Sequence, residues 1–136
     1  MADTNTVVSA LLWGGTPRQI LDGARQKDLT LFTSAILIAE LEDVLSRSKF
    51  QARIARVGSS VAEILGDYLA LATLTRPATP PPAIVRDPDD DHVIACALAA
   101  QAEVIVSGDG DLLELGEYRG IAILSAAQML QRITTT

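Results

Sequence analysis

Residues 103–124 have the sequence EVIVSGDGDLLELGEYRGIAIL, in which two apolar runs flank a stretch of glycine, leucine and acids. The runs 103–107 and 121–124 are rich in valine and isoleucine and are bounded by turn-forming residues, as is typical of buried strands. Between them, 111–115 predicts a turn or a short helix. Strands that are separated by helices favour a mostly parallel sheet covered by helices on both faces. These residues therefore predict an α/β fold.

The rest of the chain continues this alternation of helices and strands. A further strand is expected at 29–33, and Ser34 is the expected N-cap of the helix that follows it. The proline-rich stretch 76–82 predicts an extended connection that leads into a short strand at 83–85. Apolar residues at helical spacing predict helices at 5–12, 16–27, 34–45, 50–57, 61–74, 90–101 and 125–133.

Length and composition limit the class of protein. A chain of 136 residues that is 49% hydrophobic and 21% charged fits one globular domain, residues 1–136, with a single core. Aromatic residues make up only 4%, so the core is expected to be aliphatic. Cys96, the one cysteine, lies in an apolar run and is expected to be a small buried residue. Neither a signal peptide nor a long uncharged run is visible, so we expect a cytoplasmic protein without membrane contact.

The charges are unevenly distributed along the chain. A net charge of −6 and a pI near 4.6 argue against a protein that binds nucleic acid through a broad basic surface. Residues 87–117 nevertheless contain nine acids and no lysine or arginine, whereas Arg47, Lys49, Arg53 and Arg56 crowd one short stretch. This basic strip is either a solvated helical face or a set of phosphate contacts, and the sequence leaves both interpretations open.

The acids are the candidate functional groups. Asp3, Glu40 and the acidic runs 87–91 and 107–111 follow or approach the ends of predicted strands, where functional groups gather in parallel sheets. Carboxylates that meet at such an edge repel one another unless a cation lies between them. Hard oxygen ligands of this kind suit Mg²⁺ or Mn²⁺, which support phosphate chemistry. The acids therefore predict a metal-dependent enzyme that acts on phosphate esters.

Four blocks of the sequence resemble, in the same order, those of the PIN domain family and of its bacterial VapC-like branch of toxin ribonucleases. The blocks are DTNTVVSALL at 3–12, the helix at 34–46, RDPDDDHVIA at 86–95 and VSGDGDLL at 106–113. Residues 118–121 and the helix after Ser125 complete the resemblance. In the family, several apolar residues precede the Asp-Thr-Asn motif, whereas only two precede Asp3, so the first strand is expected to be truncated.

This resemblance implies a three-layer α/β/α fold and a Mg²⁺- or Mn²⁺-dependent endoribonuclease that is the toxin of a toxin–antitoxin pair. It implies that Asn5 and Ser107 orient the metal ligands by hydrogen bonds, and that Asp111 is a further acid or a helix cap. The implied partners are an RNA substrate, a cognate antitoxin and a second copy of the chain. The implied catalytic metal ligands are Asp3, Glu40, Asp91 and Asp109.

Each candidate ligand also has a simpler structural interpretation. Asp3 could only cap the helix after it, Glu40 could be a solvated helical residue, and Asp109 could serve a glycine-flanked turn. Within the aspartate run, Asp89 and Asp90 are expected to be the N-cap and first-turn residues of the next helix. Asp91 is therefore the expected ligand of the three aspartates, but the ligand could also be the aspartate one position away.

Two other functions remain as alternatives. The stretch 3–6 partly matches the Asp-x-Asp-x-Thr signature of haloacid-dehalogenase-like phosphatases, although Asn5 stands where that signature has its second aspartate. A degenerate PIN domain that binds a partner without catalysis is the other alternative. His92 has no other histidine and no suitably placed cysteine, so it is expected to face solvent rather than bind zinc.

The segment 61–74 is the expected contact surface for protein partners. Its apolar residues cover much of the circumference of the predicted helix, whereas one stripe would be enough for its own core. We therefore expect a homodimer, and an antitoxin segment that binds to apolar surface where an antitoxin exists.

Overall fold

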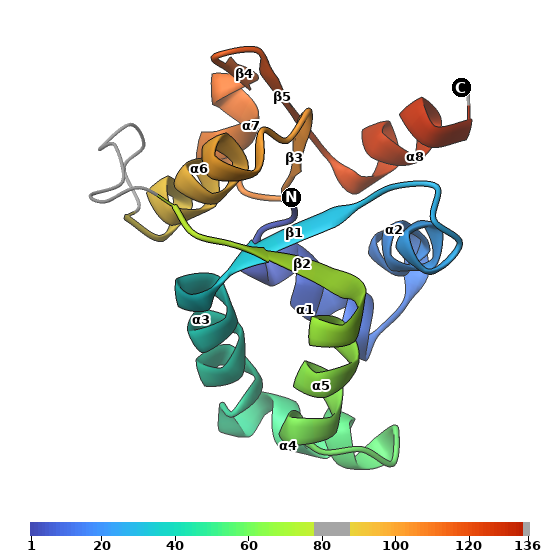
Figure 1. Cartoon of the computed structure of the whole chain (residues 1–136). Coiled ribbons are helices and arrows are strands. Elements are labelled where there is room, and N and C mark those ends of the chain that lie inside the picture. The colour runs from blue at the N-terminus through green and yellow to red at the C-terminus, as the bar shows by residue number, and fades with distance from the viewer. Residues whose placement is uncertain (78–87, 135–136) are drawn as a thin grey trace.

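The structure is a computed structural model that describes residues 1–77 and 88–134, with only the backbone described at residues 88 and 89 (Figure 1). In chain order its elements are α1 (Thr4–Leu12), α2 (Gly15–Arg25), β1 (Leu31–Ser34), α3 (Ala35–Leu45), α4 (Ser48–Arg56), α5 (Val61–Leu71), β2 (Ala72–Thr75), α6 (Pro88–Ala100), β3 (Val104–Val106), α7 (Gly110–Leu115), β4 (Glu117–Tyr118), β5 (Ile121–Leu124) and α8 (Ala126–Thr134). The predicted α/β class and the predicted alternation of elements are confirmed.

The described strands pair in two small sheets. In one sheet β1 pairs with β2 in parallel, and in the other β3 pairs in parallel with β5, which pairs antiparallel with β4. The pairing is therefore mostly parallel, as predicted. A continuous central sheet within three layers is not confirmed, because no pairing joins the two sheets among the described strands. A cavity of about 480 Å³ is lined by residues of β1, β3 and α8.

The N-terminal residues lie along β3 and make one isolated parallel bridge, between Ala2 and Val106. The backbone N–H of Val106 donates to the carbonyl of Met1 at 2.7 Å, and that of Asp3 donates to the carbonyl of Val106 at 3.0 Å. This segment therefore replaces the first strand of the expected sheet with a single bridge. Its short pairing brings Asp3 to the carboxyl end of β3.

Side-chain caps explain where several helices begin. Ser34 accepts a hydrogen bond from the backbone N–H of Leu37, which confirms it as the N-cap of α3. Ser125 and Gln128 form a reciprocal capping box at the start of α8, with N···O distances of 2.9 and 3.2 Å. These local signals account for the starts of α3 and α8. Helices α2, α4 and α6 begin one or two residues before their expected starts, and α2 and α4 have no side-chain cap.

Two elements differ from the sequence-based expectation. The helix predicted at 61–74 ends at Leu71, because Ala72–Thr75 forms strand β2 and pairs with Leu31–Ser34. Threonine at two of these four positions favours a strand, and pairing with β1 overrides the apolar helical pattern. Strand β4 was not expected, and it is only two residues long. The strand expected at 83–85 lies outside the described residues.

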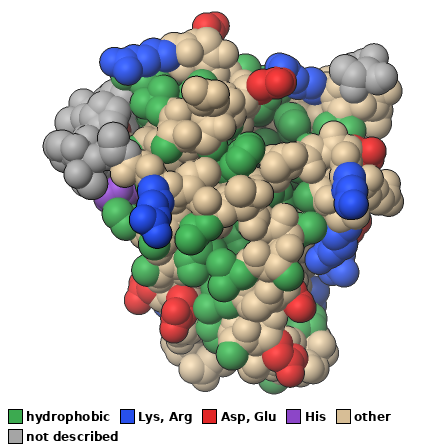
Figure 2. Space-filling model, in the orientation of Figure 1, with side chains coloured by type: hydrophobic (Ala, Val, Ile, Leu, Met, Phe, Trp, Pro, Cys, Tyr) green, Lys and Arg blue, Asp and Glu red, His purple; other side chains and the backbone are tan. Residues whose placement is uncertain are grey.

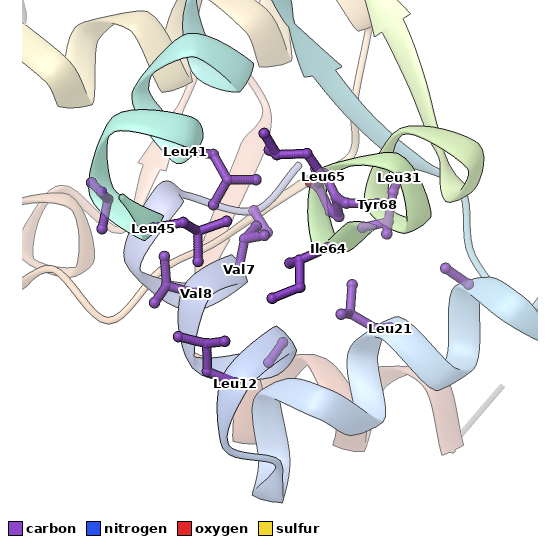
Figure 3. Packing of buried hydrophobic residues seen from close by; sticks show 14 of the residues in the cluster. Val7, Val8, Leu12, Leu21, Leu31, Leu41, Leu45, Ile64, Leu65 and Tyr68 are labelled. Atoms are coloured by element: carbon purple, nitrogen blue, oxygen red, sulfur yellow. The ribbon is translucent and has the colours of Figure 1, made fainter. Parts of the chain in front are cut away.

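Among the described residues the core forms two aliphatic clusters. The larger cluster lies between α1, α2, α3 and α5, whose apolar side chains point toward one another in Figure 3. The smaller cluster lies between α6, α7, β3 and β5. Its members include Cys96, which is fully buried as predicted and whose Sγ lies 3.3 Å from Thr75 Oγ1. Burial raises the pKa of the Cys96 thiol, so the neutral thiol is favoured.

Within residues 1–77 and 88–134, none of the helices has the length and apolarity that a membrane span requires.

Replacing Leu45 by alanine should lower the free energy of unfolding by about 2–5 kcal/mol, because it leaves a cavity in the larger cluster. Leu45 is 0% exposed, whereas Leu69 on α5 is 45% exposed. Leu69→Ala is therefore the matched control and should cost much less. Urea denaturation of both variants measures the difference, and equal losses would contradict the assignment of Leu45 to the core.

Candidate metal centre

Ser107 joins the N-terminal segment to the acidic loop after β3. Its hydroxyl donates a hydrogen bond to Asp3 Oδ2 and accepts one from the backbone N–H of Asp109 at 2.9 Å. Its own backbone N–H donates to the carbonyl of Leu124 on β5 at 2.9 Å. Ser107 is 1% exposed, so a buried hydroxyl has both of its hydrogen-bonding roles satisfied within the protein. It therefore holds the Asp3 carboxylate beside the start of the acidic loop.

Asp3 is buried and both of its carboxylate oxygens accept hydrogen bonds. Oδ1 accepts from the backbone N–H of Thr6 at 2.9 Å, which makes Asp3 the N-cap of α1, and Oδ2 accepts from Ser107. The capping role considered from the sequence is thus present. It does not remove Asp3 from the site, because the Ser107 hydrogen bond ties the same carboxylate to the acidic loop.

Asp109 begins helix α7 and orients the acids of the loop. Its Oδ1 accepts hydrogen bonds from the backbone N–H groups of Asp111 and Leu112, at 2.8 and 3.4 Å. These bonds fix the Asp109 carboxylate at the N-terminal end of the helix, where negative charge is favoured. Asp109 therefore has the structural role in the turn that the sequence suggested, and it also lies beside other acids.

Asp90, Asp109 and Asp111 form a group of three carboxylates. Each contributes one oxygen, and these oxygens all lie within 4.8 Å of one another. Asp90 is buried in the first turns of α6, whereas Asp109 and Asp111 lie nearer the surface on the loop and α7. Two segments that are nearly twenty residues apart in sequence thus converge on one acidic point.

The structure brings some of the predicted site residues together and leaves others apart. Asp109 and Asp111 belong to the carboxylate group, and Asp3 and Ser107 are linked to it by hydrogen bonds. Glu40 is half-buried on α3, which packs against α6, but it is not a member of the group. Asn5 is exposed on α1, and no hydrogen bond links its side chain to the acids among the described contacts.

The aspartate in the group from α6 is Asp90, whereas Asp91 was the residue expected from the sequence. Both side chains are buried, each with 6% of its surface exposed. Neighbouring residues in a helix point about 100° apart, because the helix has about 3.6 residues per turn. Helix α6 begins at Pro88, two residues before the expected start, and its rotation directs Asp90 toward Asp109 and Asp111. From three successive aspartates in the sequence, it cannot be predicted which one faces the acidic loop.

The chemistry of the three donors fits a divalent cation. Three carboxylates this close repel one another, and a cation between them converts that repulsion into attraction. Carboxylate oxygens are the ligands that Mg²⁺ and Mn²⁺ prefer. Nitrogen and sulfur donors are absent from this group, which argues against a zinc site there.

Comparison with protein families agrees with this geometry. A family model described as the PIN domain matches residues 1–111, which include the Asp3 segment, helix α6 and the acidic loop. The chain belongs to the PIN domain family. No curated protein and no solved structure matches the chain. PIN domains are generally nucleases that use divalent metals. The family match ends at Asp111, so the later part of the resemblance, residues 118–121 and the last helix, lies beyond it.

Millimolar Mn²⁺ should raise the midpoint of thermal unfolding relative to the protein in EDTA. A ligand that binds only the folded state stabilises it by about 2.7 kcal/mol when its concentration is about 100 times its Kd. Asp109→Asn should reduce this shift, because asparagine can still cap α7 but lacks the charge. Asp67→Asn, at an exposed acid on α5, is the control and should retain the shift. Identical midpoints for the wild type in Mn²⁺ and in EDTA would contradict the metal centre.

Proposed function

We propose that the protein is a metal-dependent endoribonuclease that hydrolyses phosphodiester bonds of RNA. The observation that carries this proposal is the convergence of Asp90, Asp109 and Asp111 in a PIN domain. A carboxylate group of this kind needs no nucleophilic side chain, because a metal ion that it holds can activate water. Hydrolysis of a phosphodiester is the reaction that such a donor set supports best.

Asp90, Asp109 and Asp111 would hold Mg²⁺ or Mn²⁺. When bound, such an ion polarises a phosphodiester and makes a water molecule a stronger nucleophile. Ser107 would hold Asp3 and Asp109 in place through its two hydrogen bonds, and Asp3 would add negative charge behind the group. Glu40 and Asp91 remain proposed further acids of the site, since α3 and α6 pack against each other.

The phosphatase alternative fits this geometry less well. A haloacid-dehalogenase-like enzyme would need its first aspartate, here Asp3, as an accessible nucleophile. Asp3 is only 5% exposed, and both of its oxygens accept hydrogen bonds. A degenerate PIN domain that only binds a partner is less favoured, because Asp90, Asp109 and Asp111 lie close enough together to hold a metal ion.

We propose a toxin role for this activity, with an antitoxin as the protein that silences it. The support is the resemblance of the Asp3, Glu40 and acidic-loop blocks to VapC-like PIN domains. An antitoxin would have to cover the acids or the apolar surface of the domain. Growth arrest on expression of the wild type, without arrest by Asp109→Asn, would support this role.

The wild type should cleave single-stranded RNA in Mg²⁺ or Mn²⁺, and Asp109→Asn should abolish most of this cleavage. Ser107→Ala removes only the hydrogen bonds that orient the acids, so it should lower activity by about 10–100-fold. Asp67→Asn is the control that should keep full activity. Asp90→Asn and Asp91→Asn, compared side by side, show which aspartate of α6 the reaction needs. Undiminished cleavage by Asp109→Asn would refute the proposed site.

We also propose that two copies of the chain pair through apolar surface. Ile36, Leu69 and Leu74 are exposed on α3, α5 and β2, and Figure 2 shows hydrophobic side chains on the face that carries these elements. Burial of such side chains against a second copy removes apolar area from water.

Light scattering at micromolar concentration should therefore give about twice the chain mass of 14.4 kDa. Leu69→Glu should shift the protein toward the monomer, because it places a charge in the apolar contact. Arg25→Gln, on α2, is a control that should leave the mass unchanged. A monomeric wild type would contradict the dimer.

A further inference from the structure

Trp13, Lys49, Phe50 and Arg53 form an aromatic–basic patch where the end of α1 meets α4. The rings of Trp13 and Phe50 are 5.7 Å apart, edge to face, at an interplanar angle of 69°. The Arg53 guanidinium lies 5.6 Å from the centroid of the Trp13 ring, and Lys49 Nζ lies 5.0 Å from that of Phe50. Both pairs have cation–π geometry. Two aromatic rings and two cations are thus gathered at one place on the surface.

Trp13 in this patch is held in position and yet exposed. It is the C-cap of α1, and its backbone N–H donates to the carbonyl of Ser9. Arg53 Nε donates to the carbonyl of Leu12 at 2.6 Å, which ties α4 to the residue before the ring. The residue remains 52% exposed. A large aromatic side chain that is fixed by its neighbours but open to solvent is typical of a binding surface rather than of a core.

The charge of the patch opposes that of the whole chain. Helix α4 contains Lys49, Arg53 and Arg56 and no acid, although the net charge of the chain is −6. Lys49 and Arg56 are exposed, and Arg53 is half-buried. A local cluster of cations beside stacking surfaces complements a polymer that offers both phosphates and bases.

We propose that the aromatic–basic patch binds single-stranded RNA, with a base stacked on Trp13 and phosphates contacted by Lys49 and by Arg56, an exposed cation of the same helix outside the patch. The choice of RNA over other polyanions rests on the proposed ribonuclease function. Stacking on an aromatic ring needs unpaired bases, so the patch selects single strands over duplexes. Arg53 acts as a positioning residue that holds the Trp13 ring.

The patch is distant from the metal centre. Asp3 caps the start of α1 and Trp13 caps its end, and a helix of nine residues is about 14 Å long. Figure 1 shows α4 at the end of the molecule opposite α6 and α7. An RNA that occupies both places must therefore extend over several nucleotides. The patch contributes to the binding of long substrates and not to that of short ones.

Trp13 is the one tryptophan of the chain, so its fluorescence reports directly on this patch. Titration of the wild type with oligouridine in EDTA, which prevents metal-dependent cleavage, should quench the emission to a saturating value. An RNA duplex should quench much less. The apparent affinity should fall as salt is raised, because phosphate contacts release counterions. Unchanged emission with oligouridine, or equal quenching by poly-glutamate, would overturn the proposal.

Trp13→Ala should weaken binding of a long oligouridine roughly tenfold in fluorescence anisotropy, as expected for the loss of one stacked base. Lys49→Gln should weaken it and reduce its salt dependence. Arg119→Gln is the matched control, since Arg119 lies 5.3 Å from the Tyr118 ring but outside the patch, and it should bind like the wild type. Equal affinities for Trp13→Ala, Lys49→Gln and the wild type would refute the patch.

The two proposals fail in different ways. Asp109→Asn should keep the fluorescence quenching while it loses cleavage, and Trp13→Ala should still cleave RNAs too short to reach α4. Quenching by RNA without cleavage by the wild type would refute the ribonuclease and leave the RNA-binding patch supported. Cleavage by the wild type without quenching would refute the patch alone.

Discussion

The buried hydroxyl of Ser107 is the contact on which the arrangement of the acids depends. Through it, the Asp3 carboxylate at the start of α1 is fixed relative to the Asp109 backbone at the start of α7. Replacement of the hydroxyl by an apolar group would leave a buried carboxylate oxygen without this donor, which costs more than an exposed hydrogen bond is worth. One side chain thereby links the starts of α1 and α7, in addition to the backbone hydrogen bonds that hold residues 1–3 on β3.

Two local groups of charge lie far apart in the molecule. Asp90, Asp109 and Asp111 gather at α6 and α7, and Lys49, Arg53 and Arg56 lie on α4, which Figure 1 shows at the opposite end. In a chain of net charge −6, such a local group of cations is where a polyanion would be repelled least. The three carboxylates repel a polyanion unless a cation lies between them.

The sequence predicted the elements better than their assembly. Local signals, such as the Ser34 cap and the apolar runs of β3 and β5, determine where helices and strands begin, and those expectations agree with the structure. Strand β2 was missed because its pairing with β1 depends on a partner forty residues away. The sequence could not show that Asp90 lies with Asp109 and Asp111, because the rotation of α6 decides which aspartate faces the loop. Phe50 and Trp13 meet only through the docking of α4 on α1, which no local pattern shows.

The hydrogen bond between Asp3 and Ser107 joins residues that are 104 positions apart. During synthesis, Asp3 is made early, whereas its hydroxyl donor and the acids of the loop before α7 are made about a hundred residues later. Helix α1 can form before then, but the carboxylate group cannot, because a contact this distant in sequence must await its partner. The acidic group is therefore among the parts of this domain that assemble late.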